Sequence, residues 1–248
     1  MDAFNMKIAG LTACIQPLFA STREYFRSYL VDLDPEFFID VAESDLRYEQ
    51  EQLDLEALEE GLRFRKFSDP FLERATIQRK VAAKLLTRDT ILMHGSTIGV
   101  DGAAYLFTAP CGTGKSTHTR YYREAFGDRT VMINDDKAFL QITPAGVLAY
   151  GSPWSGKHGL DTNICLPLKG ICFLQRGIEN RILQAERESC LCELLHQCFV
   201  PEEKGGSENA FALIHALSGS VPLWKMECTK SSEAARISYN AMSNYQQL

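Results

Sequence analysis

The chain has 248 residues, an apolar content of 45% and a formal net charge of −6 at pH 7. This length suits one large domain or two small ones, and the apolar fraction suffices for a complete core. The negative charge argues against non-specific nucleic-acid binding, and no apolar run approaches the length of a membrane span. The N-terminus lacks a basic stretch followed by an apolar one, so we expect no signal peptide and a cytoplasmic location.

The sequence holds eight cysteines, none of them in a C-x-x-C pair. In a chain of this length without a signal peptide, reduced thiols are the expected state. One local group raises the alternative of a zinc site: Cys190, Cys192, His196 and Cys198. A helix there would scatter the four side chains over different faces, so we favour reduced, mostly buried thiols.

Residues 1–67 are predicted to form a small α+β region in which we find no recognisable chemistry. Apolar residues in alternation or short runs predict strands at residues 4–8, 36–41 and 62–67. Helix-prone composition predicts helices at residues 21–30 and 45–60.

Residues 68–248 are predicted to form the second and larger region. Ser68-Asp69-Pro70 provides a helix start, and the helix is expected to run to about residue 86. Residues 90–100 read as one strand, and Asp101-Gly102 is a strong hairpin signal that returns the chain along residues 103–108. Later strands are expected at residues 130–134, 137–142, 147–150, 170–175 and 221–226. Later helices are expected at residues 116–126, 185–199, 208–217 and 232–242.

Residues 109–117, Ala-Pro-Cys-Gly-Thr-Gly-Lys-Ser-Thr, carry the composition of a phosphate-binding loop between a strand and a helix. Small residues let backbone N–H groups turn around an anion, Lys115 supplies a charge for the β/γ-phosphates, and the Ser116 hydroxyl can ligate Mg²⁺. The helix that follows directs its positive end at the phosphates. Ala109 stands where the strict pattern has glycine. The predicted nucleotide-binding residues are Pro110, Cys111, Gly112, Thr113, Gly114, Lys115, Ser116 and Thr117.

Two carboxylates, Asp135 and Asp136, follow the next apolar strand. One carboxylate at this place can ligate the Mg²⁺ of a nucleotide, and the other can accept a proton from a hydroxyl nucleophile. Two close carboxylates also raise the pKa of one of them. The alternative is a solvated acidic turn, which the neighbouring phosphate loop disfavours.

Four further cationic or titratable residues complete the predicted site. If the hairpin forms, His94 lies at the end that also holds the phosphate loop, although a lone histidine is as often structural. Lys157 and His158, in a glycine-flanked loop, can neutralise phosphate or hold a substrate carboxylate. Arg176, at a strand end, can add charge to the same cleft. For the loop that carries Lys157 and His158, the alternative is an exposed basic surface.

His94-Gly95, the Asp101-Gly102 hairpin, the phosphate loop and Asn134-Asp135-Asp136 together resemble the catalytic domain of the HPr kinase/phosphorylase family, which is related to phosphoenolpyruvate carboxykinases. The resemblance covers roughly residues 90–180. It implies an α/β fold with a mixed-sheet P-loop kinase core, preceded by the small α+β region. It also implies ATP and Mg²⁺ as cofactors, Asp135 as the proton acceptor assisted by His94, and Asp136 with Ser116 at the metal.

The bifunctional enzymes' second signature, a glycine-rich Arg-Gly-Leu-Gly-Ile run, is absent after the paired aspartates. The resemblance therefore favours single-function kinases over enzymes acting on HPr. We expect a kinase for a hydroxyl of a small molecule, peptide or protein, with no nucleic-acid or membrane partner; homo-oligomerisation stays open. Two alternatives remain, a carboxykinase-type enzyme and a nucleotide-binding regulatory module without turnover.

Overall fold

The structure, a computed structural model, describes residues 2–59, 61, 63–202 and 205–245. The chain divides into two compact units, Met1–Lys84 and Leu85–Leu248. The domain limit predicted between residues 67 and 68 lies inside the first unit, since helix α3 (Asp69–Leu86) belongs almost wholly to that unit. Among the described residues, every helix falls short of the length and apolar character that a membrane crossing needs.

The first unit contains a small sheet in the order β1-β2-β3. Its strands are β1 (Phe4–Ile8), β2 (Leu11–Gln16) and β3 (Phe37–Asp40), and its helices are α1 (Ala20–Tyr25), η1 (Arg27–Tyr29), α2 (Glu43–Glu59) and α3. The strand predicted at residues 62–67 is not found: residues 63–67 have no regular structure, and residue 62 lies outside the described residues. Backbone groups of Arg65 and Phe67 bond instead to the side chain of Gln50.

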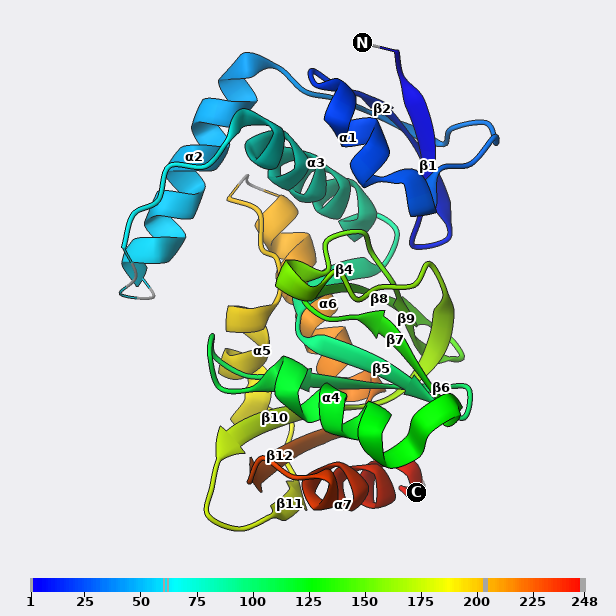
Figure 1. The fold of residues 1–248 in the computed structure, drawn as a ribbon, viewed down its shortest axis with the longest axis vertical. Coiled ribbons are helices and arrows are strands. Elements are labelled where there is room, and N and C mark those ends of the chain that lie inside the picture. Colours follow the sequence, from blue (N-terminus) through cyan, green and yellow to red (C-terminus); the bar gives the residue numbers. More distant parts are fainter. Residues whose placement is uncertain (1, 60, 62, 203–204, 246–248) are drawn as a thin grey trace. The chain divides into compact units, whose positions relative to one another are not determined.

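The second unit is built on a mixed sheet in the order β4-β8-β9-β10-β6-β5-β7, with β12 and then β11 added beside β10; its described residues give nine strands in all. Strand β10 runs parallel to β6 and β12, whereas the remaining pairs are antiparallel. The predicted mixed sheet is therefore confirmed (Figure 1). The strands are β4 (Thr90–His94), β5 (Ser96–Val100), β6 (Ala103–Thr108), β7 (Thr130–Asn134), β8 (Lys137–Thr143), β9 (Gly146–Tyr150), β10 (Cys165–Arg176), β11 (Arg181–Gln184) and β12 (Leu223–Cys228).

Gly95 divides the single strand predicted at residues 90–100 into β4 and β5, which pair with different neighbours. A Cβ atom at Gly95 would lie 2.8 Å from Leu106 Cδ2 and 3.0 Å from the carbonyl oxygen of Phe107, so only glycine fits where the chain changes partners. The Asp101-Gly102 hairpin is confirmed: β5 and β6 are antiparallel, and both turn residues have positive φ, as a tight hairpin turn requires.

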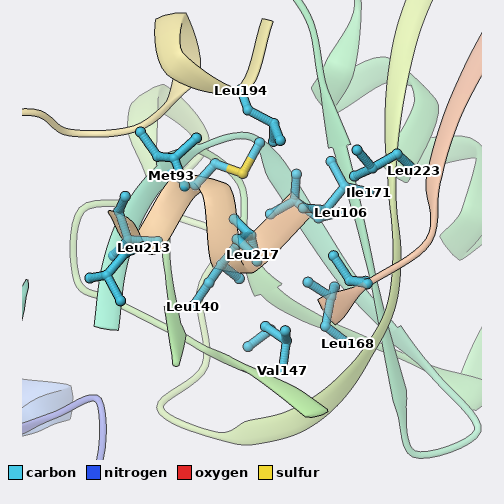
Figure 2. Packing of buried hydrophobic residues seen from close by; sticks show 14 of the residues in the cluster. Met93, Leu106, Leu140, Val147, Leu168, Ile171, Leu194, Leu213, Leu217 and Leu223 are labelled. Atoms are coloured by element: carbon cyan, nitrogen blue, oxygen red, sulfur yellow. The ribbon is translucent and has the colours of Figure 1, made fainter. Parts of the chain in front are cut away.

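Helices cover both faces of this sheet. The buried apolar residues of this unit form two clusters. Helices α4 (Lys115–Phe126) and α7 (Ser232–Ser243) pack on each other and contribute to one cluster, and α5 (Leu191–Gln197) and α6 (Gly206–Ser220) contribute to the second. Leu194, Leu213 and Leu217 of α5 and α6 meet strand residues such as Leu106 and Ile171 (Figure 2). The helix predicted at residues 185–199 is shorter than expected, because it begins only after the 3-10 turn η4 (Glu188–Cys190). Two other 3-10 turns, η2 (Gly127–Arg129) and η3 (Gly156–His158), lie in connections.

Candidate active site

The loop between β6 and α4 has the backbone that its glycines allow. Gly112 and Gly114 have φ values of 75° and 125°, which other residues adopt only under strain. Gly114 is the N-cap of α4, and no side chain caps it, so the first N–H groups of the helix are left to water or to an anion. The Lys115 ammonium group folds back across the loop and donates to the carbonyl oxygen of Ala109, 2.8 Å away.

Arg176, at the end of β10, lies against this loop from the outside. Its guanidinium group donates to the carbonyl oxygens of Gly112 and Thr113, the second at 3.4 Å. These contacts place Arg176 beside the predicted phosphate loop. They also give it a structural task, since they hold the loop's carbonyl oxygens in place.

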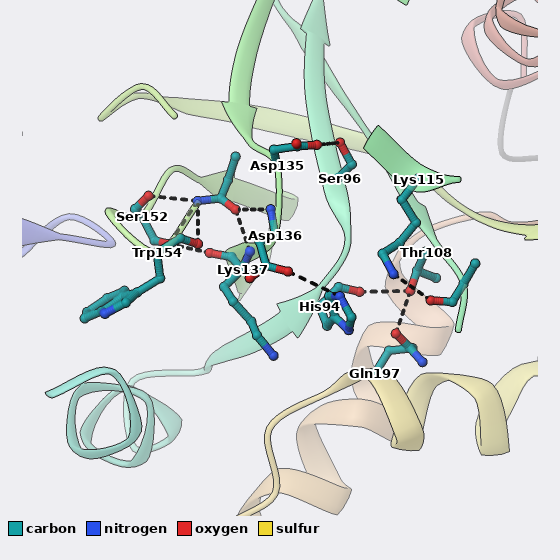
Figure 3. Close-up of polar contacts among 12 residues, drawn as sticks. His94, Ser96, Thr108, Lys115, Asp135, Asp136, Lys137, Ser152, Trp154 and Gln197 are labelled. Atoms are coloured by element: carbon teal, nitrogen blue, oxygen red, sulfur yellow. Dashed lines mark hydrogen bonds and ion pairs between the residues drawn. The ribbon is translucent and has the colours of Figure 1, made fainter. Parts of the chain in front are cut away.

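Asp135 lies buried immediately after β7, with 6% of its surface exposed. One carboxylate oxygen accepts a hydrogen bond from the Ser96 hydroxyl at 2.6 Å (Figure 3). Within the described part of the chain, no basic side chain comes within ion-pairing distance, 4 Å, of this carboxylate. A buried carboxylate without a cationic partner is costly, so this position suits a bound cation.

Asp136 contacts His94, with 3.3 Å between the carboxylate and the imidazole Nε2. The family resemblance implies that His94 assists Asp135, whereas in the structure the imidazole contacts Asp136. The strand register is the cause: β4 and β8 are antiparallel with His94 opposite Lys137, which brings the histidine beside the residue before Lys137.

The charges around this pair keep Asp136 ionised and His94 neutral at neutral pH. Burial raises the pKa of Asp136, but the hydrogen bond from His94 and the charges of Lys137 and Lys115 outweigh it, and the pKa lies below 3.8. Burial, with Lys137 and Lys115, lowers the pKa of His94 below 6.5 despite the opposing effect of Asp136. The rise in pKa expected from two adjacent carboxylates is therefore not found at Asp136.

Asn134, fully buried at the end of β7, joins the aspartate turn to the loop that follows β9. Its side-chain oxygen accepts from the backbone N–H groups of Asp136 and Lys137. Its amide nitrogen lies 2.8 Å from the carbonyl oxygen of Ser152 and 3.3 Å from that of Trp154. Because short Asn side chains bond to nearby backbone, this residue type suits the turn. Lys157 and His158, at the tip of the same loop, are exposed.

The tip of this loop comes close to Asp136. A Cβ atom at Gly156 would lie 3.2 Å from the Asp136 Cβ, so the two predicted substrate residues begin at the flank of the Asp136–His94 pair. The sequence analysis missed Ser96, Thr119, Lys137 and Gln197. Lys137 follows the aspartates directly and could have been included; Gln197, whose Oε1 lies 3.2 Å from the Thr108 hydroxyl, carries no sequence signal.

Replacing Asn134 tests this arrangement independently of any ligand. In Asn134→Ala, two backbone N–H groups and two carbonyl oxygens lose their partner, which costs about 2 kcal/mol or more of unfolding free energy. In a domain of this size the melting temperature should fall by roughly 4–8 °C. Thermal melts followed by circular dichroism measure the shift. Asn209→Ala, at an exposed helical position, is the matched control, and equal melting of both variants would contradict the role of Asn134.

The residues present fit a magnesium nucleotide on two grounds: the uncapped, glycine-shaped helix start beside Lys115, and the buried carboxylate of Asp135 without a cationic partner. Among the described residues no group of three or more His, Cys, Asp or Glu side chains could hold a metal by itself. Mg²⁺ keeps several waters and takes one or two carboxylates together with phosphate oxygens, so the Asp135 carboxylate and the Ser116 hydroxyl are of the ligand types that it needs.

Comparisons with known proteins give little guidance. No family model and no curated protein matches the chain. Among solved structures, the HPr(Ser) kinase/phosphatase from Coxiella burnetii is similar, with 10% sequence identity and a TM-score of 0.35 over 62% of this chain and 93% of that one. This neighbour is an HPr kinase, and the sequence motifs resemble the same family. A likeness this weak carries no argument, so the function must be argued from the site.

Cys111 offers a probe of nucleotide binding at the predicted phosphate loop. Its thiol is free and exposed, two residues after the buried Ala109. A nucleotide bound by this loop would cover it, and we expect MgATP to slow its alkylation. Quantitative mass spectrometry of iodoacetamide-treated protein measures the rate, with exposed Cys192 as the internal control. Equal protection of both thiols, or of neither, would count against nucleotide binding at this loop.

Proposed function

We propose that the chain is an ATP- and Mg²⁺-dependent kinase that transfers the γ-phosphoryl group to a hydroxyl acceptor. One observation carries the proposal: the Thr108 hydroxyl, at the entrance to the glycine loop, donates to the backbone carbonyl oxygen of His94 at 2.8 Å, and the His94 imidazole contacts Asp136 (Figure 3). A lysine for phosphates and an ionised carboxylate for a nucleophile are thereby brought together, as phosphoryl transfer requires.

In this proposal residues 110–117 hold the phosphates. The start of α4 and the Lys115 ammonium group neutralise negative charge on the β- and γ-phosphates. The Ser116 hydroxyl and the Asp135 carboxylate hold Mg²⁺, directly or through its waters. When bound, the ion neutralises phosphate charge.

We assign the proton acceptor to Asp136 rather than to Asp135, which exchanges the roles that the family resemblance implies. A base must reach the acceptor hydroxyl, and the Asp136 side chain is 33% exposed whereas Asp135 is buried. His94, neutral at neutral pH, orients the Asp136 carboxylate by donating from Nε2. The hydroxyl proton passes to Asp136 as the acceptor oxygen bonds to the γ-phosphorus and ADP leaves.

In this proposal Lys157 and His158 bind the phosphoryl acceptor. They are exposed on a loop whose tip touches Asp136, where they can hold an anionic group of the acceptor. The sequence predicts Arg176 as a substrate residue. Because its guanidinium group bonds to carbonyl oxygens of the glycine loop, we assign it to the nucleotide site instead.

The test is incubation of the protein with γ-labelled ATP and Mg²⁺ in the presence of pooled metabolites or peptides. A kinase transfers label to an acceptor and releases ADP. ATP binding without transfer or hydrolysis would favour the regulatory module. Transfer of label from ATP to the enol oxygen of a β-keto acid, with loss of CO₂ and release of ADP, would favour the carboxykinase-type enzyme.

A further inference from the structure

A chain of buried hydroxyl groups connects Asp135 to the first turns of α4. The Ser96 hydroxyl donates to Asp135 at 2.6 Å, and the Thr119 hydroxyl lies 2.7 Å from that of Ser96. Thr119 belongs to α4, three residues after Ser116, the residue proposed to face Mg²⁺. Ser96 and Thr119 are almost completely buried, at 0% and 1% exposed, so water does not compete for these bonds.

The direction of these hydrogen bonds follows from counting protons. A serine hydroxyl has one hydrogen, and an ionised carboxylate only accepts. Ser96 therefore gives its hydrogen to Asp135 and accepts one from Thr119. Each bond in such a series polarises the next, and a bond to an ionised acceptor is stronger than a neutral one.

One oxygen of Asp135 is thus held, while the other has no hydrogen-bond or ion-pair partner among the residues that the structure describes. A carboxylate fixed through one oxygen cannot rotate freely, so its second oxygen keeps a constant direction. Partners of this kind orient metal ligands and raise their affinity for the ion.

We propose that Ser96, supported by Thr119, is a positioning residue for Mg²⁺ at Asp135. The inference rests on the proposed function, because it concerns the metal of the same site. The inference adds that hydrogen bonds connect the Asp135 carboxylate to α4, the helix that carries Ser116. The two metal-side groups are then held at a fixed separation before nucleotide arrives, so less ordering is needed on binding.

The experiment measures the affinity of the full chain for ATP by titration calorimetry across a Mg²⁺ series, without reference to turnover. We expect Ser96→Ala to raise the Mg²⁺ concentration needed for half-maximal ATP binding by roughly 10-fold or more. Affinity for ATP in EDTA, which depends on the loop and Lys115, should stay within about twofold. Thr119→Val should show a smaller shift in the same direction, and Thr119→Ser, which keeps the hydroxyl, should behave as the wild type.

Ser238→Ala is the matched control. Ser238 is also a fully buried serine that bonds to α4, at His118 and Tyr122, but the described contacts do not connect it to Asp135. It should lower stability without moving the Mg²⁺ dependence. The inference is overturned if Ser96→Ala and Thr119→Val keep the wild-type Mg²⁺ dependence, or if Ser238→Ala shifts it equally.

If the proposed function itself is wrong, the binding experiment gives a different result. In that case the wild type binds no ATP, or binds it without regard to Mg²⁺, and the metal role of Ser96 falls with it. If Ser96→Ala does not fold, Thr119→Val and Thr119→Ser form the deciding pair, since threonine and valine have nearly the same shape.

Discussion

Asp136→Asn is expected to lower γ-phosphoryl transfer by about 10²–10⁴-fold while leaving MgATP affinity nearly unchanged. The substitution keeps the size of the side chain and a hydrogen bond to His94 but removes the proton acceptor. Added Mg²⁺ should not restore the rate, because the lost group does not hold the metal in this account. The measurement is single-turnover transfer of labelled phosphoryl at saturating ATP, across a Mg²⁺ series.

Asp135→Asn should give the opposite pattern, a raised Mg²⁺ requirement with partial recovery at high Mg²⁺. Asp128→Asn, at an exposed position away from the described contacts of the site, is the charge-matched control and should retain the wild-type rate. If Asp135→Asn abolished turnover and Asp136→Asn were rescued by Mg²⁺, the roles would return to those implied by the family resemblance. Full activity in both variants would contradict the roles assigned to both aspartates.

Lys115→Ala is expected to reduce ATP turnover by roughly 10²–10³-fold or more, since removing one preorganised charge or donor at developing charge costs this much. The charge on the β/γ-phosphates would be left to Mg²⁺ and backbone dipoles. Lys115 is largely buried, so Lys115→Met, which keeps the apolar stem, separates lost charge from lost packing. Both variants should lose turnover, and Lys115→Met should keep the wild-type melting temperature more closely.

Lys169→Met is the control for the loss of one positive charge, because Lys169 is exposed on β10. Its turnover should equal that of the wild type. Near-full activity of Lys115→Met with an identified acceptor would show that the loop does not bind the reacting phosphates.

The order of the elements around the candidate site could be predicted from sequence because it depends on local patterns. The phosphate loop requires small residues followed by lysine and a hydroxyl, and Asp101-Gly102 favours one turn type. Both features lie between elements whose apolar runs are clear. The structure accordingly has β6, the loop and α4 in the predicted succession.

The partners across the sheet could not be predicted in this way. The contact of His94 with Asp136 depends on the antiparallel register of β4 and β8, strands separated by more than forty positions. The burial of Asp135 against Ser96 depends on the break at Gly95, which looks like any small residue in a strand. These features are set by tertiary packing, which one sequence does not encode in a local pattern.

The central claim is that residues 110–117 hold nucleotide phosphates beside Asp135 and Asp136. A crystal structure with Mg²⁺ and a non-hydrolysable ATP analogue tests it most directly. The account predicts phosphates at the start of α4, with the Lys115 ammonium group moved from the Ala109 carbonyl oxygen onto a phosphate. It also predicts Mg²⁺ bound by Ser116 and Asp135 directly or through water, with Asp136 still in contact with His94. A nucleotide bound elsewhere, or a loop that stays empty at saturating analogue, would contradict it.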